Sequence, residues 1–423
     1  MSSEAVKRAL IIAFFFPPDA SSGTFRTLKF VKYLEQFGWQ CVVLSVDPKH
    51  EPLEPKDDTL LKQVPASAVV MRTFALSPLK APTRLLRGAL KWLSFPDRYV
   101  GWFPFALWRG WRAMRKYRPD VIYTTAPPVT GSLVGLALSA LTGTPLVSDF
   151  RDPWVGDHYI RNYSPTRLHM ARWLERKTFT RSAKVINISE GLSAKARERT
   201  PELPAERFAV ITNGFDPDDF VALPARVPNG EFRVTYAGCF YPPAREPRCF
   251  LQAMAWLSKH HAEEFRSISA HFVGEPGWRD ANAAWLEELK LGEHVRFLPF
   301  QPHHEAVRLL GESDALLLLG SIRKTDTGTL TGKLMEYLAA ARPILALAHE
   351  GELAQVVRES GVGVVANPES AEDIGEKLLR MHRDIRAGRF ARTTNADVVA
   401  RFDRRELTRR LAGILDTAVS VRD

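Results

Sequence analysis

One stretch of the sequence combines a helix start, a basic side chain and a carboxylate at a spacing that suits a phosphate and a ribose. Gly332, Lys333 and Glu336 follow a run rich in Thr and Gly. Backbone N–H groups at a helix start bind anions, and Lys333 would add a full positive charge. Glu336 would lie one turn further on the same helix face, where a carboxylate can accept hydrogen bonds from vicinal hydroxyls. The pattern predicts a nucleotide site, in particular for a nucleoside diphosphate. The alternative is an ordinary surface Lys–Glu pair.

Two loops that each follow an apolar segment are rich in Pro and Gly and precede a helical pattern. Residues 15–26 include Gly23, and residues 236–245 include Gly238. Ligands of open α/β sheets bind at the carboxyl ends of the strands, so both loops are expected at binding edges. Neither loop has a G-x-G-x-x-G fingerprint or a nucleoside triphosphatase P-loop, which disfavours both of those enzyme classes. A glycine after a strand is also a common turn residue, and that interpretation stays open for both positions.

A cluster of charged residues, Asp149, Arg151 and Asp152, follows another apolar segment. A carboxylate at the end of a strand could orient an acceptor hydroxyl or act as a general base. The alternative is an Arg151–Asp152 pair that only holds a loop in place. His158 is a weaker candidate. The His303-His304 pair lacks the spacing of a metal site, so no metal is expected.

Length and composition indicate a globular protein with two or three domains. The chain has 423 residues, of which 45% are hydrophobic and 25% are charged. Its three cysteines are odd in number and lack metal spacing, which favours a reducing, cytoplasmic compartment without a disulfide framework. Residues 6–16 are expected to form a buried strand rather than a signal peptide. The uncharged residues 121–148 contain several Pro and Gly, and are expected to form strands and a helix rather than a membrane span.

The net charge of +10 is concentrated in residues 84–118, which carry nine Lys or Arg, one acid and nine aromatic residues. On a helix over residues 103–117, two faces are expected. The apolar face would hold Leu107, Trp108, Trp111 and Met114. The basic face would hold Arg109, Arg112 and Lys116. Basic amphipathic helices with aromatic residues lie on anionic membrane surfaces. The alternative is a buried Trp face with a solvated Arg face. No nucleic-acid-binding signature occurs, so no nucleic acid partner is expected.

Apolar strand-like segments alternate with helical patterns along the whole chain. They lie at residues 9–16, 41–46, 69–73, 121–124, 146–149, 184–188 and 208–211, and again at 232–238, 269–273, 295–298, 315–319, 343–347 and 362–366. This alternation predicts an α/β protein with two Rossmann-like, doubly wound parallel-sheet domains. The expected divisions are a first domain at 1–213, a linker at 214–230, a second domain at 231–400 and a C-terminal helix at 401–423.

Taken in order, these motifs resemble those of a GT-B glycosyltransferase of the family 4 type, over essentially the whole chain. Residues 148–154 are similar to the "DxRDPW" signature of a subset that acts in bacterial surface-polysaccharide assembly. Residues 22–26 resemble the acceptor-side loop of the family, and residues 213–216 resemble its interdomain "NG.D" turn. Residues 332–343 resemble its donor motif "KLxEYLAxxxPI".

The resemblance implies two domains that face a cleft and a retaining, metal-independent hexosyltransferase without a cofactor. A UDP- or GDP-linked sugar would pass to a glycan or lipid-linked glycan hydroxyl. Lys333 and Arg245 would contact the diphosphate, and Glu336 would hold the ribose. Gly238 and Gly332 are expected at the same donor site. Gly23 and Arg26 would belong to the acceptor-side loop, and Asp149, Arg151 and Asp152 would be catalytic. The expected location is cytoplasmic, peripheral on the inner face of the plasma membrane.

Two positions depart from the usual pattern of the family. Gly328 stands where a second Glu commonly precedes Glu336, and Cys239 stands where an Arg often follows the strand glycine. Asp326 or Thr327 could replace the missing carboxylate. Two other functions remain open at this point: a sugar-nucleotide epimerase of the same fold, and a non-catalytic protein of the membrane surface.

Overall fold

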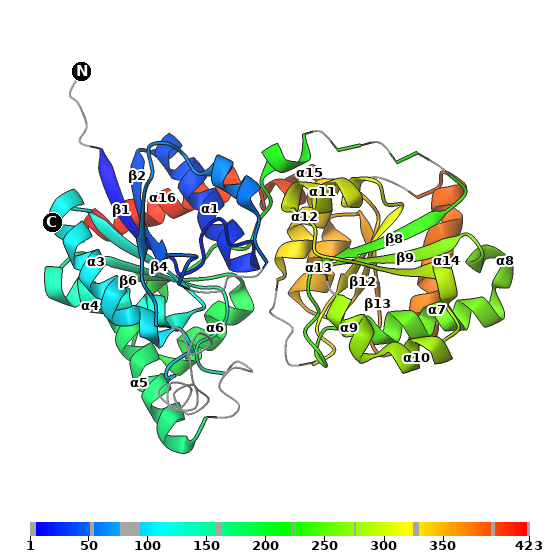
Figure 1. The fold of residues 1–423 in the computed structure, drawn as a ribbon, viewed down its shortest axis with the longest axis horizontal. Coiled ribbons are helices and arrows are strands. Elements are labelled where there is room, and N and C mark those ends of the chain that lie inside the picture. Colours follow the sequence, from blue (N-terminus) through cyan, green and yellow to red (C-terminus); the bar gives the residue numbers. More distant parts are fainter. Residues whose placement is uncertain are drawn as a thin grey trace. The chain divides into compact units, whose positions relative to one another are not determined.

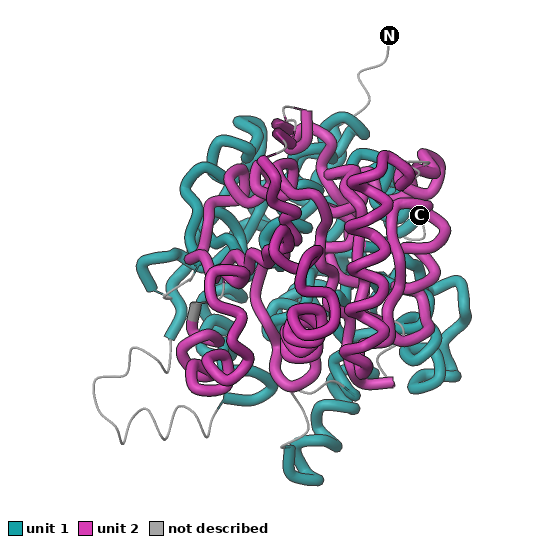
Figure 2. Tube along the Cα trace, turned by 90° about the vertical axis from the view of Figure 1, so that its right-hand side faces the viewer, with its two compact units in different colours: residues 1–212, 404–423 teal, residues 213–403 magenta. Residues whose placement is uncertain are grey.

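The computed structural model describes residues 6–50, 55–76, 94–156, 163–221, 223–224, 226–227, 229–274, 276–324, 330–390 and 394–420. The chain divides into two compact units (Figure 2). Unit 1 contains Met1–Thr212 and Arg404–Asp423, and unit 2 contains Asn213–Asp403. Each unit is built around one parallel sheet with helices on its faces (Figure 1).

The sheet of unit 1 has seven parallel strands in the order β3-β2-β1-β4-β5-β6-β7. The strands are β1 Lys7–Ile12, β2 Trp39–Val46, β3 Val69–Thr73, β4 Val121–Ala126, β5 Leu146–Phe150, β6 Ser182–Asn187 and β7 Phe208–Val210. The helices are α1 Ser22–Leu34, α3 Phe103–Tyr117, α4 Val129–Thr142, α5 Pro165–Arg181, α6 Glu190–Arg199 and α16 Arg404–Ser420. Short 3-10 turns are η1 Glu35–Phe37, η2 Asp58–Gln63, η4 Val100–Trp102 and η6 Ala205–Arg207.

Both faces of this sheet are covered, which explains why its strands read as continuous apolar runs. On one face, Leu28 and Phe30 of α1 pack with Leu411 of α16. On the other face, Met114 of α3 packs with Leu138 of α4. The uncharged residues 121–148 form β4, α4 and β5, as expected. In the part of the chain that the structure describes, no helix combines the length and apolar character needed to cross a membrane.

The helix predicted over residues 103–117 is confirmed as α3, but the alternative of a buried Trp face is wrong, and Met114 is buried while the two tryptophans are not. The buried stripe of α3 is Ala106, Gly110, Ala113 and Met114, whereas Trp108 and Trp111 are 56% and 40% exposed. A Cβ at Gly110 would lie 2.6 Å from Leu138 Cδ1, so α3 approaches α4 too closely for a large side chain at that contact. The aromatic residues therefore point outward with the arginines. Residues 84–93 of the basic segment lie outside the described residues.

The sheet of unit 2 has six parallel strands in the order β10-β9-β8-β11-β12-β13. The strands are β8 Phe232–Ala237, β9 Ile268–Val273, β10 Val295–Leu298, β11 Ala315–Leu319, β12 Ile344–Leu347 and β13 Gly363–Ala366. The helices are α7 Arg248–His260, α8 Ala262–Phe265, α9 Pro276–Ala281, α10 Ala283–Glu288, α11 His303–Gly311, α12 Gly332–Ala340, α13 Glu352–Glu359, α14 Ala371–Arg386 and α15 Ala396–Ala400, with 3-10 turns η7 Pro217–Phe220 and η8 Gly292–His294.

The chain crosses between the units twice. Phe215, in the segment expected to be a linker, donates its N–H to Phe402 O at 3.0 Å, so this segment begins within unit 2. The chain then returns to unit 1 at Arg404, and α16 lies against α1 (Figure 1). The predicted C-terminal helix is therefore part of the first unit's core, because Leu407, Leu411 and Leu415 are fully buried there.

Candidate functional site

Glycine residues end three neighbouring strands at the carboxyl edge of the unit 2 sheet. Gly238 follows β8, Gly274 follows β9 and Gly320 follows β11. Gly238 and Gly274 have φ values of 121° and 104°, in the region that favours glycine. The backbone continues the sheet at this point, since Gly238 N–H donates to Val273 O at 2.8 Å and Gly274 N–H to Leu298 O at 3.0 Å. The positive φ therefore explains why a glycine stands at position 238, where the chain turns after β8.

The side chain of Lys333 occupies the space beside Gly238. A Cβ at position 238 would lie 2.3 Å from Lys333 Cε and 2.7 Å from its Nζ. The ammonium also lies 5.3 Å from the centre of the Tyr236 ring. Tyr236 is buried, and its hydroxyl donates to Cys239 O at 2.8 Å. The structure thus brings together two predicted site residues, Gly238 and Lys333, which are far apart in the sequence.

Helix α12 is held against β8 by its buried face. Tyr337 is fully buried, and its hydroxyl accepts a hydrogen bond from Ala237 N–H at 3.1 Å. Burial raises the pKa of Tyr337, so the phenol stays neutral. Leu334 and Leu338 pack beside it in the core around β11 and β12. These contacts fix the start of α12, and hence Lys333, at the end of β8.

The N-terminus of α12 has the features of an anion site. Thr331 is the N-cap residue with an extended backbone, and its side chain makes no capping hydrogen bond. Its buried Oγ1 has no hydrogen-bond partner among the residues that the structure describes. Among the described residues, which leave out 325–329 just before this turn, no atom lies within 4 Å of a Cβ placed on Gly332. The first N–H groups of a helix bind negative charge.

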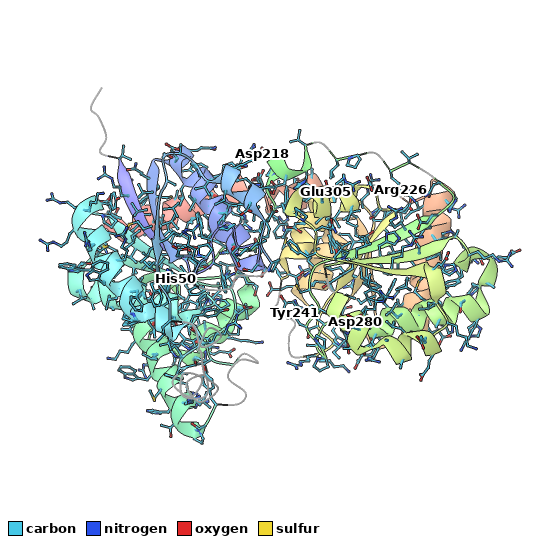
Figure 3. The ribbon with its side chains drawn as sticks, in the orientation of Figure 1. His50, Asp218, Arg226, Tyr241, Asp280 and Glu305 are labelled. Atoms are coloured by element: carbon cyan, nitrogen blue, oxygen red, sulfur yellow. The ribbon has the colours of Figure 1, made fainter. Side chains whose placement is uncertain are left out.

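Arg245 is presented by a small hairpin after β8. Tyr241 N–H donates to Arg245 O at 2.7 Å, and Arg245 N–H donates to Tyr241 O at 2.9 Å. The guanidinium lies 5.7 Å from the centre of the Tyr241 ring. Tyr241 is exposed and is labelled in Figure 3. The buried Nε of Arg245 lacks a hydrogen-bond partner within the described ranges. The hairpin thus holds a second cation after the strand that carries Gly238.

Glu336 lies half-buried on α12, one turn beyond Lys333, as the sequence predicted. The loop before α12 is described only in part. Asp326, Thr327 and Gly328, which bear on the missing second carboxylate, lie outside the described residues. Cys239 follows Gly238 directly and is exposed. Of the groups predicted to contact a donor, the structure places two cations, one carboxylate and a helix N-terminus.

In unit 1, Arg26 and Asp149 form a buried ion pair. Arg26 Nε donates to Asp149 Oδ2 at 2.7 Å, and its second terminal nitrogen donates to Oδ1 at 3.1 Å. The guanidinium also donates to the carbonyl oxygens of Ile211 and Thr212, at 2.9 and 2.7 Å. Tyr123 donates its hydroxyl to the same carboxylate. Burial lowers the pKa of Arg26, but Asp149 and Tyr123 raise it more, so the arginine stays charged.

The first loop and the Arg151 segment meet beside this pair. The Arg151 side chain donates to Ala126 O at 3.3 Å and to Pro127 O. A Cβ at Gly23 would lie 2.3 Å from an Arg151 nitrogen, so only glycine allows this approach without a shift. Asp152 follows Arg151 and is half-buried. Burial lowers the pKa of Arg151, and Asp152 opposes that effect.

Asp19 was not singled out from the sequence, although it lies in the same loop. It is buried and accepts hydrogen bonds from the N–H of Ser21 at 3.0 Å and from the hydroxyls of Ser21 and Thr24. Burial raises its pKa. The sequence does contain a pattern that indicates this role, because an Asp followed by Ser and Thr at short spacing is typical of a turn that its own side chains stabilise. Tyr123 and Tyr337 were also missed, because buried tyrosines carry no local pattern.

The remaining candidates add no site. His158 lies outside the described residues. His303 Nε2 lies 3.1 Å from Asp219 Oδ2, which explains it as a structural contact between α11 and η7. In the described part of the chain, no group of three or more His, Cys, Asp or Glu is arranged to hold a metal ion. Metal independence itself stays a prediction.

Comparisons with known proteins agree with the two-unit division. Residues 24–214 match the family described as glycosyl transferase 4-like domain. Residues 228–392 match the family described as glycosyl transferases group 1. No curated protein shows significant sequence similarity to the chain.

Solved structures share the fold over nearly the full chain. Sucrose-phosphate synthase from Thermosynechococcus elongatus has a TM-score of 0.72 at 14% identity, with 98% of this chain and 100% of that chain covered. Anabaena HepE in complex with UDP-glucose has a TM-score of 0.66 at 18% identity, with 97% and 99% covered. UDP-GlcNAc 2-epimerase from Neisseria meningitidis has a TM-score of 0.57 at 12% identity, with 96% and 99% covered. The two sheets, of seven and six strands, are thus the two Rossmann-like domains of the GT-B fold.

Proposed function

The chain belongs to the GT-B glycosyltransferases of the family 4 and group 1 type, and we propose that it moves a sugar from a nucleoside diphosphate sugar to a hydroxyl of a glycan or lipid-linked glycan. The observation that carries this proposal is the position of Lys333, in the first turn of α12, whose ammonium lies against Gly238 at the end of β8. A cation and a helix N-terminus together suit a diphosphate.

The donor residues would act on the leaving group. During transfer, the bond between sugar C1 and the diphosphate oxygen breaks, and the acceptor oxygen bonds to C1. Negative charge then grows on the released diphosphate. Lys333, Arg245 and the N–H groups of α12 would stabilise that charge, since preorganised donors act most strongly where charge develops. Glu336 would accept hydrogen bonds from the ribose hydroxyls. UDP and GDP are both proposed carriers, and the UDP-glucose complex of HepE supports the first.

The buried ion pair leads us to divide the three residues expected to be catalytic. Both carboxylate oxygens of Asp149 accept hydrogen bonds inside unit 1, from Arg26 and Tyr123. Asp149, Arg26 and Tyr123 are all buried. We therefore propose that Asp149 and Arg26 position the loop rather than contact substrate. Asp152 is the better candidate to orient the acceptor hydroxyl or to take its proton, and Arg151 would hold Asp152 and Gly23 in place.

Retention of the anomeric configuration and independence of metal are also part of the proposal. Both come from the resemblance to family 4 enzymes. The cations Lys333 and Arg245 would supply the charge that neutralises the diphosphate.

A thermal-shift screen against UDP, GDP, ADP and their sugars tests the donor assignment. A ligand at about 100 times its Kd stabilises the native state by about 2.7 kcal/mol, so one nucleotide should raise the Tm clearly above the others. No shift with any of them would contradict the donor site.

The second step separates transfer from epimerisation. The donor that binds is incubated alone and with candidate acceptors, and the products are identified by NMR, which also reports the anomeric configuration. Transfer requires that product forms only with acceptor. Conversion of the donor sugar without acceptor would instead indicate an epimerase, and an inverted linkage would contradict retention.

A further inference from the structure

Three helices lie in a row on one face of the unit 1 sheet. Helix α4 contacts α3 on one side and α5 on the other (Figure 1). Gly110 allows α3 to approach Leu138 of α4. On the other side, Arg181 of α5 donates to Ser139 of α4, with 3.0 Å from Nε to Oγ and 2.6 Å from a terminal nitrogen to the carbonyl oxygen. The outer surfaces of α3, α4 and α5 are called the three-helix face below.

The three-helix face exposes an unusual share of large apolar side chains. Among the described residues, six large apolar side chains on these helices are exposed: Phe105, Trp108, Trp111, Leu141, Met170 and Trp173. Trp108 and Trp173 are 56% and 55% exposed, although Trp is usually well buried. Phe74, also exposed, adjoins Phe105 with 4.8 Å between ring centres. Apolar side chains gathered in this way mark an interaction surface.

The charge on the same helices is almost entirely positive. The basic residues are Arg109, Arg112, Arg115 and Lys116 on α3 and Arg167, Arg172, Arg176, Lys177 and Arg181 on α5. Their single acid, Glu175, is buried and paired with Arg199 at 2.9 Å. Asp97, which precedes α3, accepts hydrogen bonds from the N–H and hydroxyl of Thr130, at 2.9 and 2.7 Å. Neither carboxylate is therefore exposed on the three-helix face. Glu202, outside these helices, pairs with Arg176 at 2.6 Å and offsets the charge of that one residue.

Aromatic rings and cations are interleaved on this face. Arg112 lies 5.0 Å from the Trp108 ring centre and Arg115 lies 4.9 Å from that of Trp111. On α5, Lys177 lies 5.9 Å from the Trp173 ring centre. An open depression of about 550 Å³ lies among α3 side chains that include Trp108, Trp111 and the four basic residues. The buried Nε of Arg109, which lines it, has no hydrogen-bond partner among the described residues.

We propose that the three-helix face docks on the surface of an anionic lipid bilayer, with a lipid phosphate held in the depression on α3. The exposed Trp, Phe and Met side chains would enter the headgroup region, and the arginines and lysines would bind phosphates. Charge complementarity selects this partner, since nine basic residues without an exposed acid on the same helices favour an anionic surface. The proposal goes beyond sugar transfer, and it extends the basic segment recognised in the sequence to α5.

The test is sedimentation of the full-length protein with vesicles of phosphatidylcholine, with and without phosphatidylglycerol. The wild type should bind only the anionic vesicles, and added salt should remove part of the binding. Arg112→Glu with Lys116→Glu should weaken binding about 30-fold or more, since each basic residue near the surface contributes about 1 kcal/mol. Trp173→Ala should reduce the fraction of protein that stays bound to the vesicles at high salt. This variant tests the role of α5 separately.

A matched control is Lys259→Glu with Arg380→Glu, which changes net charge equally on exposed positions of unit 2. This control should bind as the wild type does. The proposal is overturned if the wild type stays in the supernatant, if it binds neutral vesicles equally, or if the control loses as much affinity as the α3 variant. A dimer in sedimentation velocity that the α3 variant abolishes would also overturn it, in favour of a second copy as the occupant. Nucleotide binding by thermal shift should be the same in all variants, so this test is independent of the donor site.

Discussion

At the scale of single residues, the proposed donor site depends on the close approach of Lys333 to Gly238. The glycine has a positive φ and lacks the Cβ that would meet the lysine side chain. Neither residue has this meaning alone, because a glycine after a strand and a lysine at a helix start are both common. Together they place one ammonium at the carboxyl end of β8, where ligands of open α/β sheets bind.

Lys333→Ala should leave the fold intact and lower kcat by roughly 10²–10³-fold, the effect of losing one donor to a developing anion. Steady-state kinetics with the identified donor measures it. Lys259→Ala, at an exposed position of α7, is the matched control and should leave kcat unchanged. A turnover within about threefold of wild type, or about 0.7 kcal/mol in the barrier, would contradict the donor assignment.

Glu336→Gln should weaken nucleotide binding more than it slows the chemical step. Ribose contacts are made equally in the ground and transition states, so their loss raises Kd and KM while kcat changes little. Titration calorimetry with the free nucleotide gives Kd directly. Glu376→Gln on the exposed side of α14 serves as control. If the Kd of Glu336→Gln equals that of wild type, the ribose role is wrong.

At the scale of elements, a buried ion pair connects several segments at the carboxyl edge of the unit 1 sheet. Arg26 comes from α1 and Asp149 from β5, and Arg26 also binds the carbonyls after β7. Breaking a buried pair leaves an uncompensated charge, which costs more than the pair contributes. The loop that carries Gly23 and the segment that carries Arg151 therefore share one support.

Asp149→Asn should lower the free energy of unfolding by about 3–5 kcal/mol, because Arg26 would stay buried without its partner. Asp152→Asn should instead keep the stability and lower kcat, as expected for a carboxylate at the acceptor. Urea denaturation and kinetics on both variants distinguish the roles. Glu305→Gln, which removes an exposed pair with Arg308, should change neither quantity measurably. Wild-type stability of Asp149→Asn would refute its positioning role.

At the scale of the whole molecule, unit 1 is built from both ends of the chain. Helix α16 follows all of unit 2 in the sequence and completes the core on the α1 face of unit 1. The first 212 residues therefore lack part of the apolar surface that covers their sheet. Unit 1 should consequently be less stable when it is expressed without α16.

Leu411→Ala should lower the free energy of unfolding by about 2–5 kcal/mol, the usual effect of a Leu→Ala change in a full core. Leu411 is 0% exposed and lies on α16, which packs against α1. Denaturation of the variant, followed by limited proteolysis, should show that residues of unit 1 become sensitive first. Leu141→Ala, at a position 67% exposed, is the control. A variant as stable as wild type would show that α16 is not part of the unit 1 core.

The sequence by itself determined the element types and the two-domain division, and it predicted the donor motif. Strands and helices follow from local periodicity. Gly238 and Lys333 were each predicted from turn chemistry or helix-start electrostatics, which need only neighbouring residues, whereas their contact is tertiary. The family resemblance rested on the same local motifs. These features are readable because their physical causes act over a few residues.

Only the tertiary structure decided which side chains are buried together. Asp149 was expected to be catalytic as part of a cluster after a strand, but it lies within β5, and its pairing with Arg26 joins residues 123 positions apart. Trp108 faces outward because Gly110 packs against Leu138 of another helix. Such contacts leave no local pattern, because burial is set by the element that packs against a residue and not by its sequence neighbours.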